Sequence, residues 1–150
     1  MPRRATLLLI EDSEDDSALF KRALTSASVP VELRIVGSCS QAREYLLGAG
    51  EFIDRTAFPF PQLIISDNCR ETFGTAELLR WLRTKPECQV IPVIVMTGSA
   101  SPAIIRSSYD LGVHSVFEKP AKNTDLQALL QLMVAYWSKA LVPGMAAEEE

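Results

Sequence analysis

The chain has 150 residues, enough to bury the core of one domain, and 47% hydrophobic residues is an ordinary fraction for a globular protein. A formal net charge of −4 disfavours nucleic-acid binding driven by phosphate contacts, and no run approaches the roughly 18 apolar residues of a membrane span. The basic start lacks the apolar core of a signal peptide, and three cysteines without metal-type spacing indicate free thiols, so we expect a cytoplasmic domain.

Five runs rich in apolar residues predict strands, which in chain order cover about residues 5–11, 31–36, 62–67, 91–97 and 113–118. Apolar residues at helical spacing predict five helices, from Ser13 to about Ala27, over about 40–48, from Gly74 to near Pro86, over about 102–111, and from the cap Asn123 to Pro143. No repeat or linker interrupts the chain. Residues 1–150 are therefore predicted as one domain, with a core over about 5–141 and a C-terminal tail over 142–150.

The alternation of strands and helices predicts an α/β fold with a parallel sheet. Right-handed crossovers then favour a flavodoxin-like (βα)5 doubly wound sheet with the strand order 2-1-3-4-5. The second run alternates apolar and polar residues, which is typical of an edge strand with one wetter face. The first and third strands are neighbours in this order.

Polar side chains stand at the ends of four predicted strands. Glu11 and Asp12 follow the first strand, Asp67 ends the third, Thr97 ends the fourth, and Lys119 follows the fifth. The carboxyl ends of parallel strands meet at one edge of the sheet, where open α/β sheets bind ligands. The three acids are therefore predicted to share one crevice.

The predicted crevice has the chemistry that phosphoryl transfer requires. Three neighbouring carboxylates need a proton or a cation between them, and hard oxygen ligands suit Mg²⁺. Asp67 is the best-placed nucleophile, because carboxylates form acyl phosphates in enzymes. The Lys119 ammonium and the Thr97 hydroxyl can bind the oxygens of an incoming phosphoryl group.

Four motifs in this order give the chain a resemblance to the response-regulator receiver domains of two-component signalling, over about residues 5–141. The motifs are Leu9-Ile10-Glu11-Asp12, Ile64-Ile65-Ser66-Asp67, Val95-Met96-Thr97-Gly98 and Glu118-Lys119-Pro120-Ala121. The contexts Trp81-Leu82-Arg83 and Tyr136-Trp137 are most similar to small single-domain regulators, including those paired with phytochrome-type sensor kinases.

The resemblance implies a role for each acid at the sheet edge. Asp67 is implied as the phosphoacceptor, Asp12 as a direct Mg²⁺ ligand, and Glu11 as an acid that acts through water. The backbone carbonyl of Cys69 is implied as a further metal ligand. Receivers of this family take the phosphoryl group from a sensor histidine kinase or a histidine phosphotransfer protein. They dephosphorylate themselves and are not turnover enzymes.

The resemblance also implies Thr97 as the switch hydroxyl and Lys119 as the phosphate-sensing lysine, with a cis peptide bond before Pro120. Leu132 and Tyr136 fall partly off the apolar stripe of the last helix, where core packing is the simplest role of the leucines. The sequence therefore also allows these residues to form a surface for a partner. That partner could be a second copy, in a homodimer through the fourth helix, the fifth strand and the last helix.

The loop after Asp67 departs from the family pattern. Glu71 stands where the family usually has proline, and Gly74 comes seven residues after Asp67 instead of eight. Val116 replaces the aromatic residue that usually precedes the lysine by three positions. The guanidinium of Arg70 either turns in to neutralise the acids or points to solvent.

Other functions remain in competition. The main alternative is a degenerate receiver that acts as a phosphorylation-independent protein interaction module. A phosphatase of the haloacid-dehalogenase type is disfavoured because Cys69 stands where its second acid belongs, and a flavodoxin is disfavoured because the acids from Glu11 to Asp16 would repel a flavin phosphate. Glu14, Asp15 and Asp16 are assigned to stabilising the start of the first helix.

Overall fold

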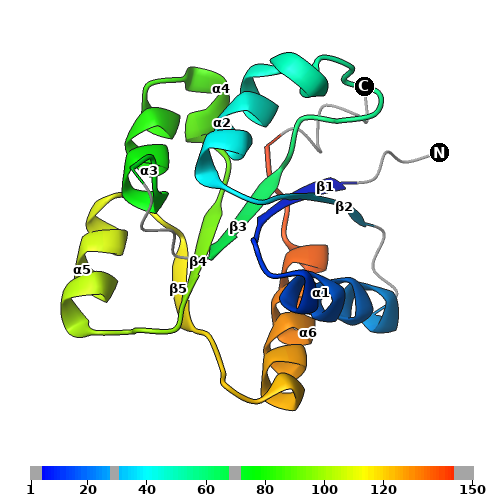
Figure 1. The fold of residues 1–150 in the computed structure, drawn as a ribbon, viewed down its shortest axis with the longest axis vertical. Coiled ribbons are helices and arrows are strands. Elements are labelled where there is room, and N and C mark those ends of the chain that lie inside the picture. The colour runs from blue at the N-terminus through cyan, green and yellow to red at the C-terminus, as the bar shows by residue number, and fades with distance from the viewer. Residues whose placement is uncertain (1–4, 28–30, 68–71, 144–150) are drawn as a thin grey trace.

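The computed structural model describes residues 5–27, 31–67 and 72–143, drawn in colour in Figure 1. Five parallel strands form one sheet in the order β2-β1-β3-β4-β5, which confirms the predicted flavodoxin-like topology. The strands are β1 (Ala5–Ile10), β2 (Val31–Val36), β3 (Leu63–Asp67), β4 (Val93–Thr97) and β5 (Ser115–Glu118).

Helices cover both faces of the sheet. They are α1 (Glu14–Ala27), α2 (Cys39–Leu47), α3 (Thr75–Arg83), α4 (Pro86–Gln89), α5 (Pro102–Asp110) and α6 (Asn123–Lys139), with a short 3-10 helix η1 (Gly50–Phe52) after α2. The helices α1 and α6 pack on one face, and α2, α3 and α4 pack on the other, with α5 beside α3 (Figure 1). Within the described ranges, no helix is both long and apolar enough to span a bilayer.

The central strands are buried on both faces, as their continuous apolar runs predict. Leu8 and Ile10 of β1 point into the cluster under α2 and α3, whereas Leu7 and Leu9 point into the cluster under α1 and α6. The strand β2 lies at the edge of the sheet, as predicted, but five of its six residues are half-buried, without the alternation that one wetter face would give.

Local signals explain where several helices begin and end. Ser13 caps α1, since its Oγ accepts a hydrogen bond from the Asp16 N–H at 3.2 Å. Gly48 adopts φ +66° and ends α2, as predicted for a C-terminal glycine. Ser101 caps α5 through a hydrogen bond from the Ile104 N–H, and Pro102 opens that helix.

The third helix, α3, follows Gly74 and ends at Arg83, close to the predicted stop near Pro86, but the short helix α4 that begins at Pro86 was not predicted. The last helix was predicted wrongly at both ends. Asn123 is the first residue of α6 and not its cap, a position that Lys122 takes. The helix ends at Lys139, before the predicted stop, because the chain becomes extended at Ala140 and Val142 is buried again.

Candidate functional site

The acids predicted to share a crevice lie together at the carboxyl edge of the sheet. The strands β1 and β3 pair so that Ile10 lies opposite Ser66, and each next residue in the chain is acidic. Glu11, Asp12 and Asp67 each offer one carboxylate oxygen, and these oxygens lie within 4.8 Å of one another. The sheet register therefore converts two separate sequence motifs into one acidic cluster.

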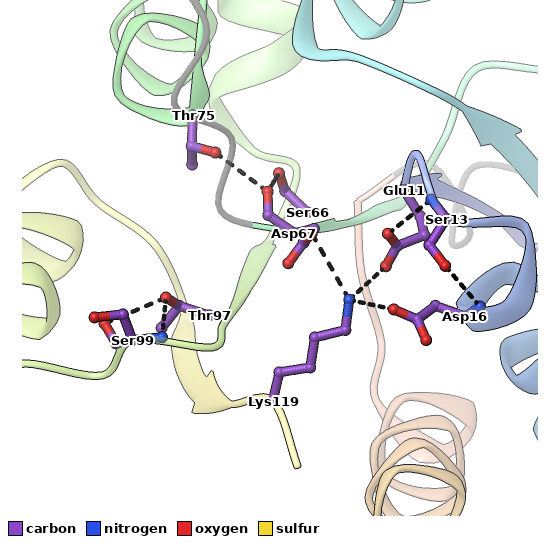
Figure 2. Close-up of polar contacts among 9 residues, drawn as sticks. All are labelled: Glu11, Ser13, Asp16, Ser66, Asp67, Thr75, Thr97, Ser99 and Lys119. Atoms are coloured by element: carbon purple, nitrogen blue, oxygen red, sulfur yellow. Dashed lines mark hydrogen bonds and ion pairs between the residues drawn. The ribbon is translucent and has the colours of Figure 1, made fainter. Parts of the chain in front are cut away.

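Lys119 brings a positive charge into this cluster from the end of β5 (Figure 2). Its Nζ lies 2.6 Å from Asp16 Oδ2, 3.0 Å from Glu11 Oε1 and 3.7 Å from Asp67 Oδ2. The Lys119 backbone N–H donates a hydrogen bond to the Thr97 carbonyl at 2.8 Å. This bond anchors the backbone of Lys119 beside the end of β4. The side chain is 17% exposed, so its ammonium is an internal cation of the site.

The predicted cis peptide before Pro120 was wrong. The described part of the chain contains no cis peptide bond, so the Lys119–Pro120 bond is trans. The ammonium nevertheless contacts Glu11 and Asp16 with this bond in trans.

The ion pair between Glu11 and Lys119 changes the pKa of both groups. Burial raises the pKa of Glu11, and the hydrogen bond and charge of Lys119 only partly offset that rise. Burial by itself lowers the pKa of Lys119, but the hydrogen bonds to Asp16 and Glu11 and the charge of Asp67 outweigh it and raise the pKa above its usual range. The ammonium therefore stays charged at any physiological pH.

Asp16 is a site residue that the sequence analysis missed. Its backbone N–H serves the cap of α1, but its carboxylate turns toward Lys119 and makes the shortest contact of that ammonium within the cluster. Glu14 and Asp15 are exposed in the same turn, in agreement with a role in helix stabilisation. The one available signal was that Asp16 follows a strand-end acid pair within a single helical turn.

Two buried hydroxyls hold the end of β3, and neither was singled out in the sequence. The Asp67 carbonyl accepts hydrogen bonds from Ser66 Oγ at 2.7 Å and from Thr75 Oγ1 at 3.3 Å. Both side chains are almost fully buried. They fix the backbone that carries the Asp67 carboxylate and join it to the start of α3.

Thr97 lies at the predicted strand end, but its hydroxyl is turned toward the following loop. The Thr97 Oγ1 accepts from the Ser99 N–H at 3.1 Å and donates to the Ser99 carbonyl at 3.3 Å (Figure 2). Val116 is half-buried in β5, and its backbone N–H donates to the Tyr109 hydroxyl at 3.2 Å. The predicted roles of Cys69 and Arg70 fall outside the described residues, and so does Glu71.

The three carboxylates fit a hard divalent cation. Such cations prefer oxygen ligands and accept one or two carboxylates together with water. Glu11 is buried, Asp67 is half-buried and Asp12 is exposed, so the set combines a fixed interior acid with one open to solvent. We therefore assign the candidate metal site to these three residues.

Comparison with known proteins points to one class of relative. No protein-family model matches the chain. Response regulator Rcp1 from Synechocystis sp. is 30% identical over 131 residues, which cover 87% of this chain and 87% of that protein. The crystal structure of Mn²⁺-bound Rcp1 matches with a TM-score of 0.84 at 28% identity, covering 93% of this chain and 99% of the other. The phosphorylated cyanobacterial phytochrome response regulator RcpA matches with a TM-score of 0.86 at 28% identity, covering 95% and 100%.

Proposed function

The chain belongs to the response-regulator receiver family of two-component signalling, with similarity to phytochrome-associated regulators, and from this we propose that it accepts a phosphoryl group on Asp67. The observation that carries the proposal is the position of the Asp67 carboxylate. It lies at a strand end, shares an acidic cluster with Glu11 and Asp12, and faces the Lys119 ammonium at 3.7 Å. As a receiver, the chain is a signalling protein and not a turnover enzyme.

In the proposed reaction, a carboxylate oxygen of Asp67 attacks the phosphorus of the donor. The bond from phosphorus to the donor atom breaks, and its electron pair leaves with the donor as the aspartyl phosphate forms. Lys119 then binds an oxygen of the phosphoryl group, since its ammonium already faces Asp67. Thr97 contributes its hydroxyl after exchanging the contacts with Ser99 for a phosphoryl oxygen.

The residues proposed to hold the metal are Asp12 and Asp67 through their carboxylates, Glu11 through water, and Cys69 through its backbone carbonyl. We propose Mg²⁺ as the ion, since it prefers hard oxygen ligands. A divalent ion bound there neutralises charge on the transferred phosphoryl group. Rcp1 has been crystallised in a Mn²⁺-bound form, and the carboxylate set of this chain supports a divalent site of the same class.

The proposed phosphodonor is a sensor histidine kinase or a histidine phosphotransfer protein. We further propose a cytoplasmic location, and a single receiver domain over residues 1–150 with its core at about 5–141. Membership of the two-component family supports the kinase partner.

The direct test is intact mass spectrometry after incubation with acetyl phosphate and Mg²⁺. Wild-type protein is expected to gain the mass of one phosphoryl group, because one carboxylate combines the acceptor position with the metal site and Lys119. A chelator should prevent the gain. If the mass stays unchanged in Mg²⁺, the phosphoacceptor proposal is wrong and the phosphorylation-independent interaction module takes its place.

We also propose a homodimer through the face formed by α5, β5 and α6. An apolar groove of about 490 Å³ lies between β5 and α6 and includes Phe117, Leu129 and Met133. Leu132 and Tyr136 on this groove are 69% and 60% exposed, as expected for residues off the core-facing stripe. Apolar side chains exposed beside a groove support contact with a second copy.

The dimer proposal predicts that Leu132→Lys weakens self-association by about tenfold or more, since it places a charge in an apolar contact. Sedimentation velocity across a concentration series measures this effect. Val90→Lys is the matched control, because Val90 is also exposed but lies after α4 on the far side of the sheet. A wild type that remains monomeric at high concentration contradicts the dimer.

A further inference from the structure

Lys119 is held most closely by an acid that does not stand at a strand end. Its Nζ is 2.6 Å from Asp16 Oδ2, against 3.0 Å from Glu11 Oε1 and 3.7 Å from Asp67 Oδ2. Asp16 approaches from α1, and Asp67 approaches the ammonium from another side (Figure 2). The ammonium therefore lies closer to the carboxylate that α1 supplies than to the carboxylate of Asp67.

Two of the three carboxylates of the candidate metal site also surround the Lys119 ammonium. Glu11 and Asp67 belong to the metal-type cluster and also face the ammonium, whereas Asp16 belongs only to the surroundings of the ammonium. Two cations that share carboxylates at this range repel each other. The affinity of the site for a divalent cation must therefore depend on where the ammonium is held.

We propose that Asp16 is a positioning residue that holds the Lys119 ammonium to one side of Glu11 and Asp67, so that a divalent cation and Lys119 occupy the site together. The inference rests on the proposed metal site. Asp16 touches neither the metal nor the phosphoryl group in this account and acts only through Lys119. Without its carboxylate, the ammonium is left with Glu11 and Asp67 and competes directly with the divalent cation.

The positioning role can be separated from the helix-start role of the same residue. The cap of α1 uses the backbone N–H of Asp16, which donates to Ser13 Oγ, and Asp16→Asn leaves that bond intact. Asp15 is the matched control, because it is an exposed acid in the same helical turn. Asp15→Asn removes the same charge from the same turn without removing a contact to Lys119.

Calorimetric titration with Mg²⁺ tests the proposal. Asp16→Asn is expected to weaken Mg²⁺ binding by about tenfold, the size of one charge-assisted hydrogen bond. Asp15→Asn should change the affinity by less than about twofold, because an exposed charge is screened. Asp16→Glu keeps a carboxylate within reach of the ammonium and should retain most of the affinity.

A double-mutant cycle then asks whether Asp16 acts through Lys119. Lys119→Gln removes the competing cation, so adding Asp16→Asn to that variant should weaken Mg²⁺ binding no more than Asp15→Asn does. An equal loss in both backgrounds overturns the proposal, because Asp16 would then act on the metal through its own charge. No loss in either background also overturns it and leaves Asp16 as a helix-start residue.

The position of the ammonium has a readout that needs no metal. In the presence of chelator, the ¹H–¹⁵N resonance of the Lys119 ammonium should shift in Asp16→Asn and stay unchanged in Asp15→Asn. An unchanged resonance in Asp16→Asn overturns the inference. If the wild type does not bind Mg²⁺, the proposed metal site is wrong, and so is the predicted effect of Asp16 on Mg²⁺ affinity. The Lys119 resonance decides separately whether Asp16 holds the ammonium.

Discussion

Replacing Asp67 with Asn is expected to abolish phosphoryl-group incorporation from acetyl phosphate. The amide has nearly the same shape as the carboxylate, but it has no anionic oxygen to attack phosphorus. It also removes one of the three carboxylates of the candidate metal site. Intact mass spectrometry should therefore show one added phosphoryl group on the wild type and none on the variant.

The control for this result is Glu118→Gln. Glu118 is an exposed acid at the carboxyl end of β5, so the substitution also removes a negative charge at the edge of the sheet that carries Asp67. It should leave phosphorylation at the wild-type level. Equal labelling of wild type and Asp67→Asn would place the phosphoryl group elsewhere and contradict the assignment of Asp67.

Replacing Lys119 with Gln is expected to lower the free energy of unfolding by about 2–3 kcal/mol at neutral pH in the presence of chelator. The substitution leaves the carboxylates of Glu11, Asp16 and Asp67 without their shared cation. Glu11 dominates the effect, because its side chain is only 3% exposed. Urea denaturation measures the change, and Lys122→Gln, at an exposed lysine three residues further on, is the control.

The destabilisation should grow as the pH rises above 4.5, the unfolded pKa of Glu11. The pKa of Lys119 is raised by folding, so its contribution is complete below its unfolded value of 10.5 and does not vary over this range. The pKa of Glu11 is also raised, so between 4.5 and its folded pKa the folded state binds more protons and stability falls with rising pH. Lys119 lowers the pKa of Glu11, so removing Lys119 raises the folded pKa of Glu11 further. The pH range over which stability falls is therefore wider in Lys119→Gln than in the wild type.

Unfolding curves at several pH values check this dependence. A difference in unfolding free energy between wild type and Lys119→Gln that stays constant as the pH rises from 4.5 contradicts the assigned coupling between Glu11 and Lys119. Mg²⁺ should restore part of the lost stability, since ligand binding to the folded state stabilises it by mass action.

The sheet and the acidic cluster were predictable because their signals are local. Continuous apolar runs such as Leu7–Ile10 and Leu63–Ile65 are typical of strands that are buried on both faces of a parallel sheet. Once the strand order follows from right-handed crossovers, the acids after β1 and β3 must become neighbours. The proximity of Glu11, Asp12 and Asp67 was therefore a consequence of topology.

The roles of single side chains at the edge were less predictable. Asp16 has the sequence signature of a helix start, and only the tertiary position of Lys119 reveals its second contact. The Thr97 hydroxyl was predicted to bind an oxygen of the phosphoryl group, and nothing in the sequence indicated that the Ser99 backbone two residues away offers it both a donor and an acceptor. The end of α6 depended on burial of Val142, which is a tertiary contact as well.

The pairing register of the sheet also has a consequence for the folding kinetics. The contact between β1 and β3 joins Leu7 to Leu63, whereas β1 and β2 pair through Ala5 and Val31. Closing the longer segment costs more chain entropy, so we expect the pairing of β1 with β3 to form late. That same pairing brings Glu11 to Asp67, so we expect most of the repulsion between their carboxylates to arise after the transition state for folding. Substitutions in the cluster should therefore change the unfolding rate far more than the folding rate.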